Sequence, residues 1–114
     1  MYDSLLPFID VKDSLTRLAD NKSLLGRLFT KFKCREMCDA LIERMIVNDI
    51  AKIIDDAHMI KGVAANLGLR ELERILQQIE AAAKANQETT SMIDTLNDAI
   101  EKTEESIQLF LDTL

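Results

Sequence analysis

The single histidine of this 114-residue chain, His58, is the residue best suited to chemistry. A free imidazole is mostly neutral at pH 7, so one ring nitrogen can act as a nucleophile, and a phosphoryl group is a suitable electrophile. The middle of a helix offers no free backbone N–H groups for the charge of a phosphoryl group, so a nearby cation is needed. Lys61 meets this need, because a lysine three positions after a histidine leans back over the ring.

A glycine beside this pair indicates that the ring is reached from outside. Gly62 lies within a well-patterned helical segment, where it costs about 1 kcal/mol relative to alanine without an evident local reason. We interpret the missing side chain as a shallow depression through which another macromolecule approaches His58. Apolar neighbours of the histidine are candidates for the docking surface: Ile54, Met59 and Ala65. For Ile54, a wider buried stripe on the helix is an equally good interpretation.

The chain shows no motif for making its own phosphoryl donor or for binding a metal. It lacks the GxxxxGK[ST] phosphate-binding loop, so we expect ATP to be handled elsewhere. One histidine and two cysteines, Cys34 and Cys38, give no common zinc-ligand spacing. We expect the cysteines to be reduced, half-buried helix residues with a packing role, and we expect no metal site.

The elements that would position His58 are predicted to be helices, because apolar residues recur at helical spacing almost throughout. Asp10 can cap a short first helix that ends near Asp20, and Asn21 can cap a longer second segment. The apolar stripe of that second segment changes phase between Lys33 and Glu36. We therefore expect a bend or a break there.

Three further helices are each predicted from one regular apolar stripe. The first begins at 48–49, contains His58 and stops at Gly68; the second covers 69–83. Polar residues then interrupt the pattern, and the last stripe runs over 93–114. Short connections between such stripes predict an all-α, up-and-down antiparallel four-helix bundle with a short extra N-terminal helix. We interpret residues 1–114 as a single domain.

Composition and charge exclude several classes of function. The chain is 47% hydrophobic and 30% charged, which is typical of a globular domain. Fourteen Lys and Arg against twenty Asp and Glu give a net charge of −6, which argues against nucleic acid or an anionic membrane as the main partner. No apolar run approaches the roughly 18 residues of a membrane-spanning helix. We therefore expect no direct membrane insertion and a cytoplasmic location.

The stretch 57–69, AHMIKGVAANLGL, closely resembles the AHxxKGxAxxxG signature of histidine-containing phosphotransfer (Hpt) domains. The flanking segments also resemble the family, so the resemblance covers most of the chain. It implies that His58 accepts a phosphoryl group from an aspartyl phosphate of a receiver domain and passes it to another receiver aspartate. It further implies that Lys61 neutralises the phosphoryl oxygens, that Gly62 gives access, and that Glu80 on the neighbouring helix hydrogen-bonds His58 and fixes its tautomer.

The same resemblance implies the partners. They would be response-regulator receiver domains and a cognate or parent hybrid histidine kinase, with the chain either free-standing or the C-terminal module of that kinase at the inner membrane face. Mg²⁺ would be supplied by the receiver, so we expect no cofactor in this chain. Without an ATP-binding kinase domain, its status as an enzyme stays open. The alternative is a helical-bundle adaptor that binds a receiver or another signalling protein without being phosphorylated; Lys61 and Gly62 favour the carrier.

Overall fold

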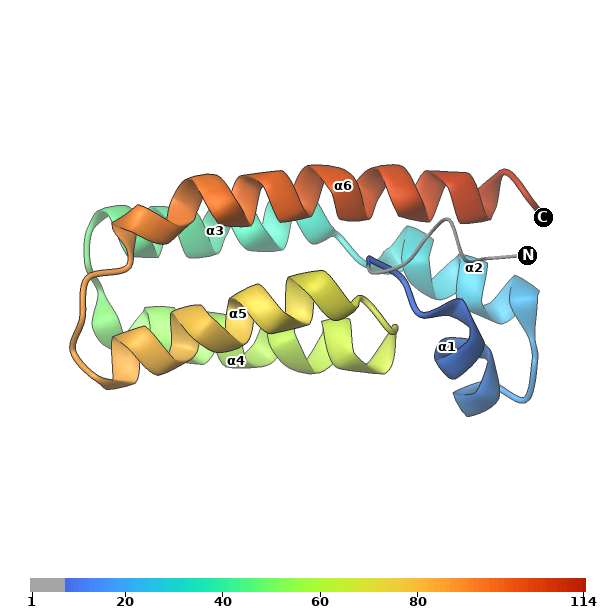
Figure 1. Ribbon diagram of the computed structural model, residues 1–114, viewed down its shortest axis with the longest axis horizontal. Coiled ribbons are helices and arrows are strands. Elements are labelled where there is room, and N and C mark those ends of the chain that lie inside the picture. The colour runs from blue at the N-terminus through green and yellow to red at the C-terminus, as the bar shows by residue number, and fades with distance from the viewer. Residues whose placement is uncertain (1–7) are drawn as a thin grey trace.

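The protein is represented by a computed structural model, whose described part is residues 8–114; these residues form helices and no strands (Figure 1). The helices are α1 (Val11–Arg17), α2 (Lys22–Lys31), α3 (Cys34–Ile46), α4 (Ile50–Asn66), α5 (Arg70–Lys84), the 3-10 helix η2 (Thr90–Met92) and α6 (Ile93–Leu111). No helix in the described range is long and apolar enough to cross a membrane.

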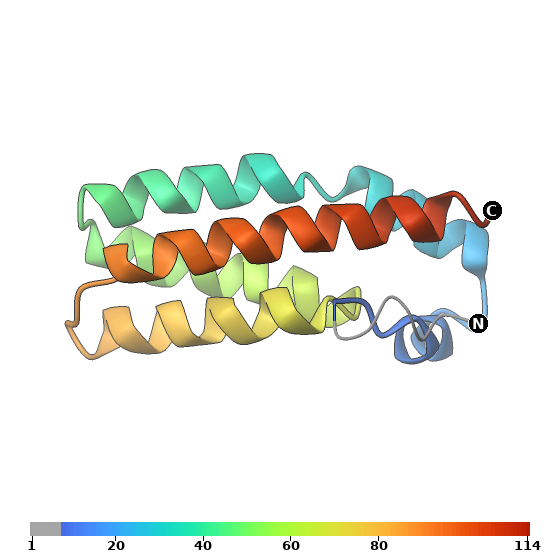
Figure 2. The same ribbon diagram turned by 45° about the horizontal axis from the view of Figure 1, so that its top comes forward.

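Helices α3, α4, α5 and α6 form an antiparallel four-helix bundle, each packed against its two neighbours in the bundle (Figures 1 and 2). Helix α2 continues roughly in line with α3, and both lie against α6. Helix α1 is the short extra helix, at the end of the bundle where α4 passes into α5. The molecule measures 41 × 22 × 21 Å. The predicted fold class is confirmed.

The starts of α1, α2 and α4 are fixed by local side-chain caps. The side chains of Asp10, Asn21 and Asp49 each accept a hydrogen bond from the backbone N–H three residues further on, at 2.9–3.3 Å. Between α2 and α3, Phe32 has an extended backbone with a ψ of 106°, which separates the two helices. The predicted starts and the predicted break are therefore confirmed.

Gly68 makes the tight turn between α4 and α5. Its φ of +73° lies in the left-handed region, where a side chain is unfavourable. A Cβ there would also lie 2.9 Å from the carbonyl oxygen of Asp10. This close approach anchors α1, because the Asp10 N–H donates to the Gly68 carbonyl at 2.8 Å and the Ser14 hydroxyl donates to the Leu67 carbonyl at 2.8 Å.

Two sequence predictions about packing need correction. The stripe of the last helix was expected to reach Leu114, but α6 ends at Leu111 and Leu114 is 59% exposed. Beyond Leu111 the chain forms a turn, in which the Thr113 hydroxyl and N–H both donate to the Phe110 carbonyl. The two cysteines are fully buried rather than half-buried, and they are free. A hydrogen bond with the Cys34 thiol and burial raise the pKa of the Cys38 thiol, so the Cys38 thiol stays protonated.

Candidate functional site

His58 lies in the middle of α4 with its ring open to solvent. Its side chain is 69% exposed, while the adjacent Ala57 and the nearby Ile60 are fully buried. The periodicity of α4 accounts for this placement, because His58 follows a core position and so stands on the edge of the helix. An external group can reach the ring.

Glu80 brings α5 to this ring. Its side chain is only 5% exposed, and its Oε2 lies 3.1 Å from Nδ1 of His58. Lys61 Nζ lies 2.7 Å from the other carboxylate oxygen, Oε1, and Lys84 Nζ lies 2.9 Å from Oε2. These four residues form what we call the His58 cluster, with the carboxylate at its centre.

The charge state of Glu80 determines which nitrogen of His58 is reactive. The Lys61 ammonium, assisted by Lys84 and His58 and opposed by desolvation, lowers the pKa of Glu80 to about 2. Glu80 is therefore ionised at pH 7 and can only accept hydrogen bonds. It follows that Nδ1 of His58 carries the proton and donates a hydrogen bond to Glu80. The free lone pair is then on Nε2.

The structure brings together three of the residues singled out in the sequence, but one of their contacts differs from the one expected. Glu80 faces His58, as the family resemblance implied. Lys61 was expected beside the imidazole, but its ammonium contacts Glu80. Lys84 was not predicted as a site residue, although its position four residues after Glu80 on the same helix was an available signal for an ion pair.

Gly62 has no structural partner that explains it. It is exposed on α4, and a Cβ built there would meet nothing within 4 Å. Among the apolar candidates for docking, Met59 is 52% exposed and Ala65 is partly buried. Ile54 is also partly buried and packs against the core, so it does widen the buried stripe.

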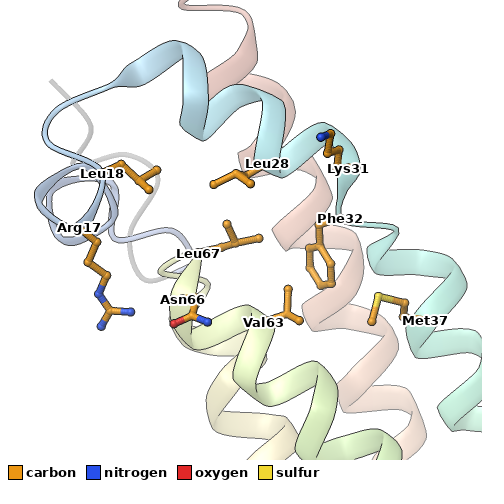
Figure 3. Close-up of a pocket in the computed structure, with 9 residues that line it drawn as sticks. All are labelled: Arg17, Leu18, Leu28, Lys31, Phe32, Met37, Val63, Asn66 and Leu67. Atoms are coloured by element: carbon orange, nitrogen blue, oxygen red, sulfur yellow. The ribbon is translucent and has the colours of Figure 1, made fainter.

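An apolar groove of about 580 Å³ lies between α4 and the helices that precede it in the chain (Figure 3). Helices α1, α2, α3 and α4 all contribute to its lining, which is made by Arg17, Leu18, Leu28, Lys31, Phe32, Met37, Val63, Asn66 and Leu67. On α4, Val63 and Asn66 directly follow Gly62 and Ala65 in sequence. The groove was not predicted from the sequence.

Within residues 8–114, no group of three or more His, Cys, Asp or Glu is placed to hold a metal ion. No curated protein and no solved structure gives a significant match. The family model of the Hpt domain matches residues 31–106, which include α3, α4 and α5, most of α6 and the whole His58 cluster. The chain therefore belongs to the Hpt domain family, whose function is histidine phosphotransfer in phosphorelay signalling.

Proposed function

We propose that His58 carries the phosphoryl group, taking it from the aspartyl phosphate of one receiver domain and passing it to the aspartate of another. The observation that carries the proposal is an exposed imidazole whose Nδ1 is bonded to an ionised, buried carboxylate. That contact holds the proton on Nδ1 and leaves Nε2 free for attack.

The transfer step needs no proton movement. The Nε2 lone pair attacks phosphorus, so an N–P bond forms while the P–O bond to the receiver aspartate breaks and the aspartate leaves as a carboxylate. The ring gains a positive charge, which the Glu80 carboxylate stabilises through the Nδ1–H contact. Lys61 neutralises the phosphoryl oxygens. The same steps in reverse return the group to a receiver.

Docking of the receiver centres on Gly62. The open space above this residue lets the receiver approach the helix backbone next to His58, and Ile54, Met59 and Ala65 offer apolar contacts. The groove extends this apolar area, because its residue Val63 adjoins Gly62. Together these features support a docking surface that runs across the outer face of α4.

The remaining assignments concern partners and setting. The family relays phosphoryl groups with receiver domains. We infer that the specific partners are response regulators and a cognate or parent hybrid kinase, and that residues 1–114 act as one unit in the cytoplasm or at the inner membrane face. Mg²⁺ is supplied by the acidic pocket of the receiver, and this chain contributes no cofactor.

Incubation with a phosphorylated receiver domain tests the proposal. We expect label to appear on this chain as acid-labile, base-stable phosphate, and to disappear in His58→Gln. The matched control is Gln77→Ala, an exposed residue of α5, which should accept label like the wild type. Binding of a receiver without any label would contradict the proposal and support the adaptor instead.

A further inference from the structure

Two lysines converge on one buried carboxylate. Lys61 Nζ contacts Oε1 of Glu80, and Lys84 Nζ contacts Oε2, the oxygen that also faces His58. The side chain of Glu80 is 5% exposed, whereas that of Lys84 is 59% exposed. One lysine is enough to neutralise one carboxylate, so the second calls for an explanation.

Phosphorylation of His58 changes the demand on Lys61. A phosphoryl group brings about two negative charges to the site. Lys61 lies on α4, one turn after His58, so its side chain can reach a phosphoryl group on the ring; Lys84 lies on α5. If Lys61 moved to the phosphoryl oxygens with no other cation present, the buried Glu80 carboxylate would lose its compensating charge, which is costly for a side chain that is only 5% exposed.

We propose that Lys84 is a positioning residue, which keeps Glu80 paired while Lys61 moves from Glu80 to the phosphoryl group on His58. The inference rests on the proposed function of His58. Lys84 acts through Glu80 and not on the reacting atoms, and the exchange of ion pairs makes and breaks no covalent bond. Its effect is to free Lys61 for the phosphoryl group while Glu80 stays ionised and bonded to Nδ1.

The state of Lys61 can be measured on the phosphorylated chain without any receiver domain. The full chain is phosphorylated chemically with phosphoramidate, and the ³¹P NMR signal of the phosphohistidine is followed as a function of pH. An ammonium in contact with the phosphoryl group favours its dianion and lowers the midpoint of this titration. The variants are Lys84→Ala, Lys84→Arg, Glu80→Gln and the double variant Glu80→Gln with Lys84→Ala.

We expect Lys84→Ala to raise the midpoint by about half a pH unit, or about threefold in the ionisation constant, because Glu80 then retains Lys61. Lys84→Arg should restore the wild-type midpoint. In the Glu80→Gln background, removal of Lys84 should have almost no effect, because a neutral amide needs no cation. Lys102→Ala, which removes an exposed lysine paired on α6, is the matched control and should change nothing.

Two results would overturn the inference. One is an unchanged midpoint in Lys84→Ala. The other is an equal shift in the presence and absence of the Glu80 carboxylate, which would mean that Lys84 acts on the phosphoryl group directly. Circular dichroism of each variant checks that the fold is retained. Failure of receiver domains to label the chain would instead contradict the proposed function, so the two failures are distinguishable.

Discussion

At the scale of single residues, Glu80 is the centre of the site. It accepts from the imidazole on one oxygen and meets an ammonium on each, so a carboxylate that would be unfavourable in isolation is kept ionised. The contact between Glu80 and His58 then determines the tautomer. A glutamine could accept the same hydrogen bond, but it would not oppose the charge that the ring gains during transfer.

The low pKa of Glu80 predicts a pH dependence of stability. Because its pKa of about 2 in the folded protein lies below the ordinary value of 4.5, ionised Glu80 stabilises the fold above about pH 4.5, and this contribution is lost as the pH falls toward 2. We expect the contribution to be about 1–2 kcal/mol, after allowance for solvent screening at the exposed Lys84.

Urea unfolding of the wild type and Glu80→Gln between pH 7 and pH 2.5 measures this contribution. The difference in the free energy of unfolding should be constant near neutral pH and shrink on acidification. Glu101→Gln, at an exposed position on α6, serves as the control. Parallel curves for the wild type and Glu80→Gln over the whole range would show that the Glu80 ion pairs contribute nothing.

At the scale of the elements, α4 has two glycines with different roles, one at its end and one within it. Gly68 is required by the fold, because of its positive φ and the approach of the Asp10 carbonyl. Gly62 is not required, because space is open where its side chain would be. The first glycine ends α4, and the second leaves part of α4 bare in the middle.

Substitution of these glycines should therefore change stability in opposite directions. Gly62→Ala should stabilise the protein by about 0.5–1 kcal/mol through helix propensity, whereas Gly68→Ala should destabilise it by about 1 kcal/mol or more through strain. Thermal unfolding measures both. A larger side chain at position 62, in Gly62→Trp, should keep the fold and reduce transfer from a receiver at least tenfold. Normal transfer by this variant would exclude docking over Gly62.

Sequence patterns predicted those parts of the fold that are decided locally. The caps at Asp10, Asn21 and Asp49 depend on residues three positions apart, so the helix starts were recognisable. The predicted last helix was too long, because an apolar stripe does not reveal where the helix gives way to a turn such as the one in which the Thr113 hydroxyl donates to the Phe110 carbonyl.

The site was predicted less completely, because its contacts join different helices. The spacing of His58, Lys61 and Gly62 identified one helix face, but the contact with Glu80 spans 22 residues and came only from the family resemblance. The contact of Lys61 with Glu80 depends on three-dimensional distances that no sequence spacing gives. The groove needs the packing of α1, α2, α3 and α4, so its lining could not be assembled from the sequence.

At the scale of the whole molecule, the groove is lined in part by α4, the helix that carries His58, and a receiver docked there would shield its apolar lining from water. The double variant Val63→Thr with Met37→Gln keeps the size of both side chains and makes them polar. We expect it to raise the receiver concentration needed for half-maximal transfer about three- to tenfold, with the rate at saturation unchanged.

Transfer kinetics at increasing receiver concentration provide this measurement, and Leu109→Gln, on an exposed face of α6, is the control. A lower rate at saturation with an unchanged half-maximal concentration would mean that the groove influences the chemistry rather than the encounter. Unchanged kinetics would separate the groove from the docking surface altogether.

The family match begins at residue 31, so α1 and nearly all of α2 precede it, and so do Arg17, Leu18 and Leu28 of the groove. The wall that those two early helices build therefore lies outside the matched residues that carry the histidine. A receiver docked over the groove would contact this wall as well as the matched bundle, so the early segment would contribute to discrimination among receivers. Exchanging that segment between two such carriers should redirect a signal without altering the group that carries it.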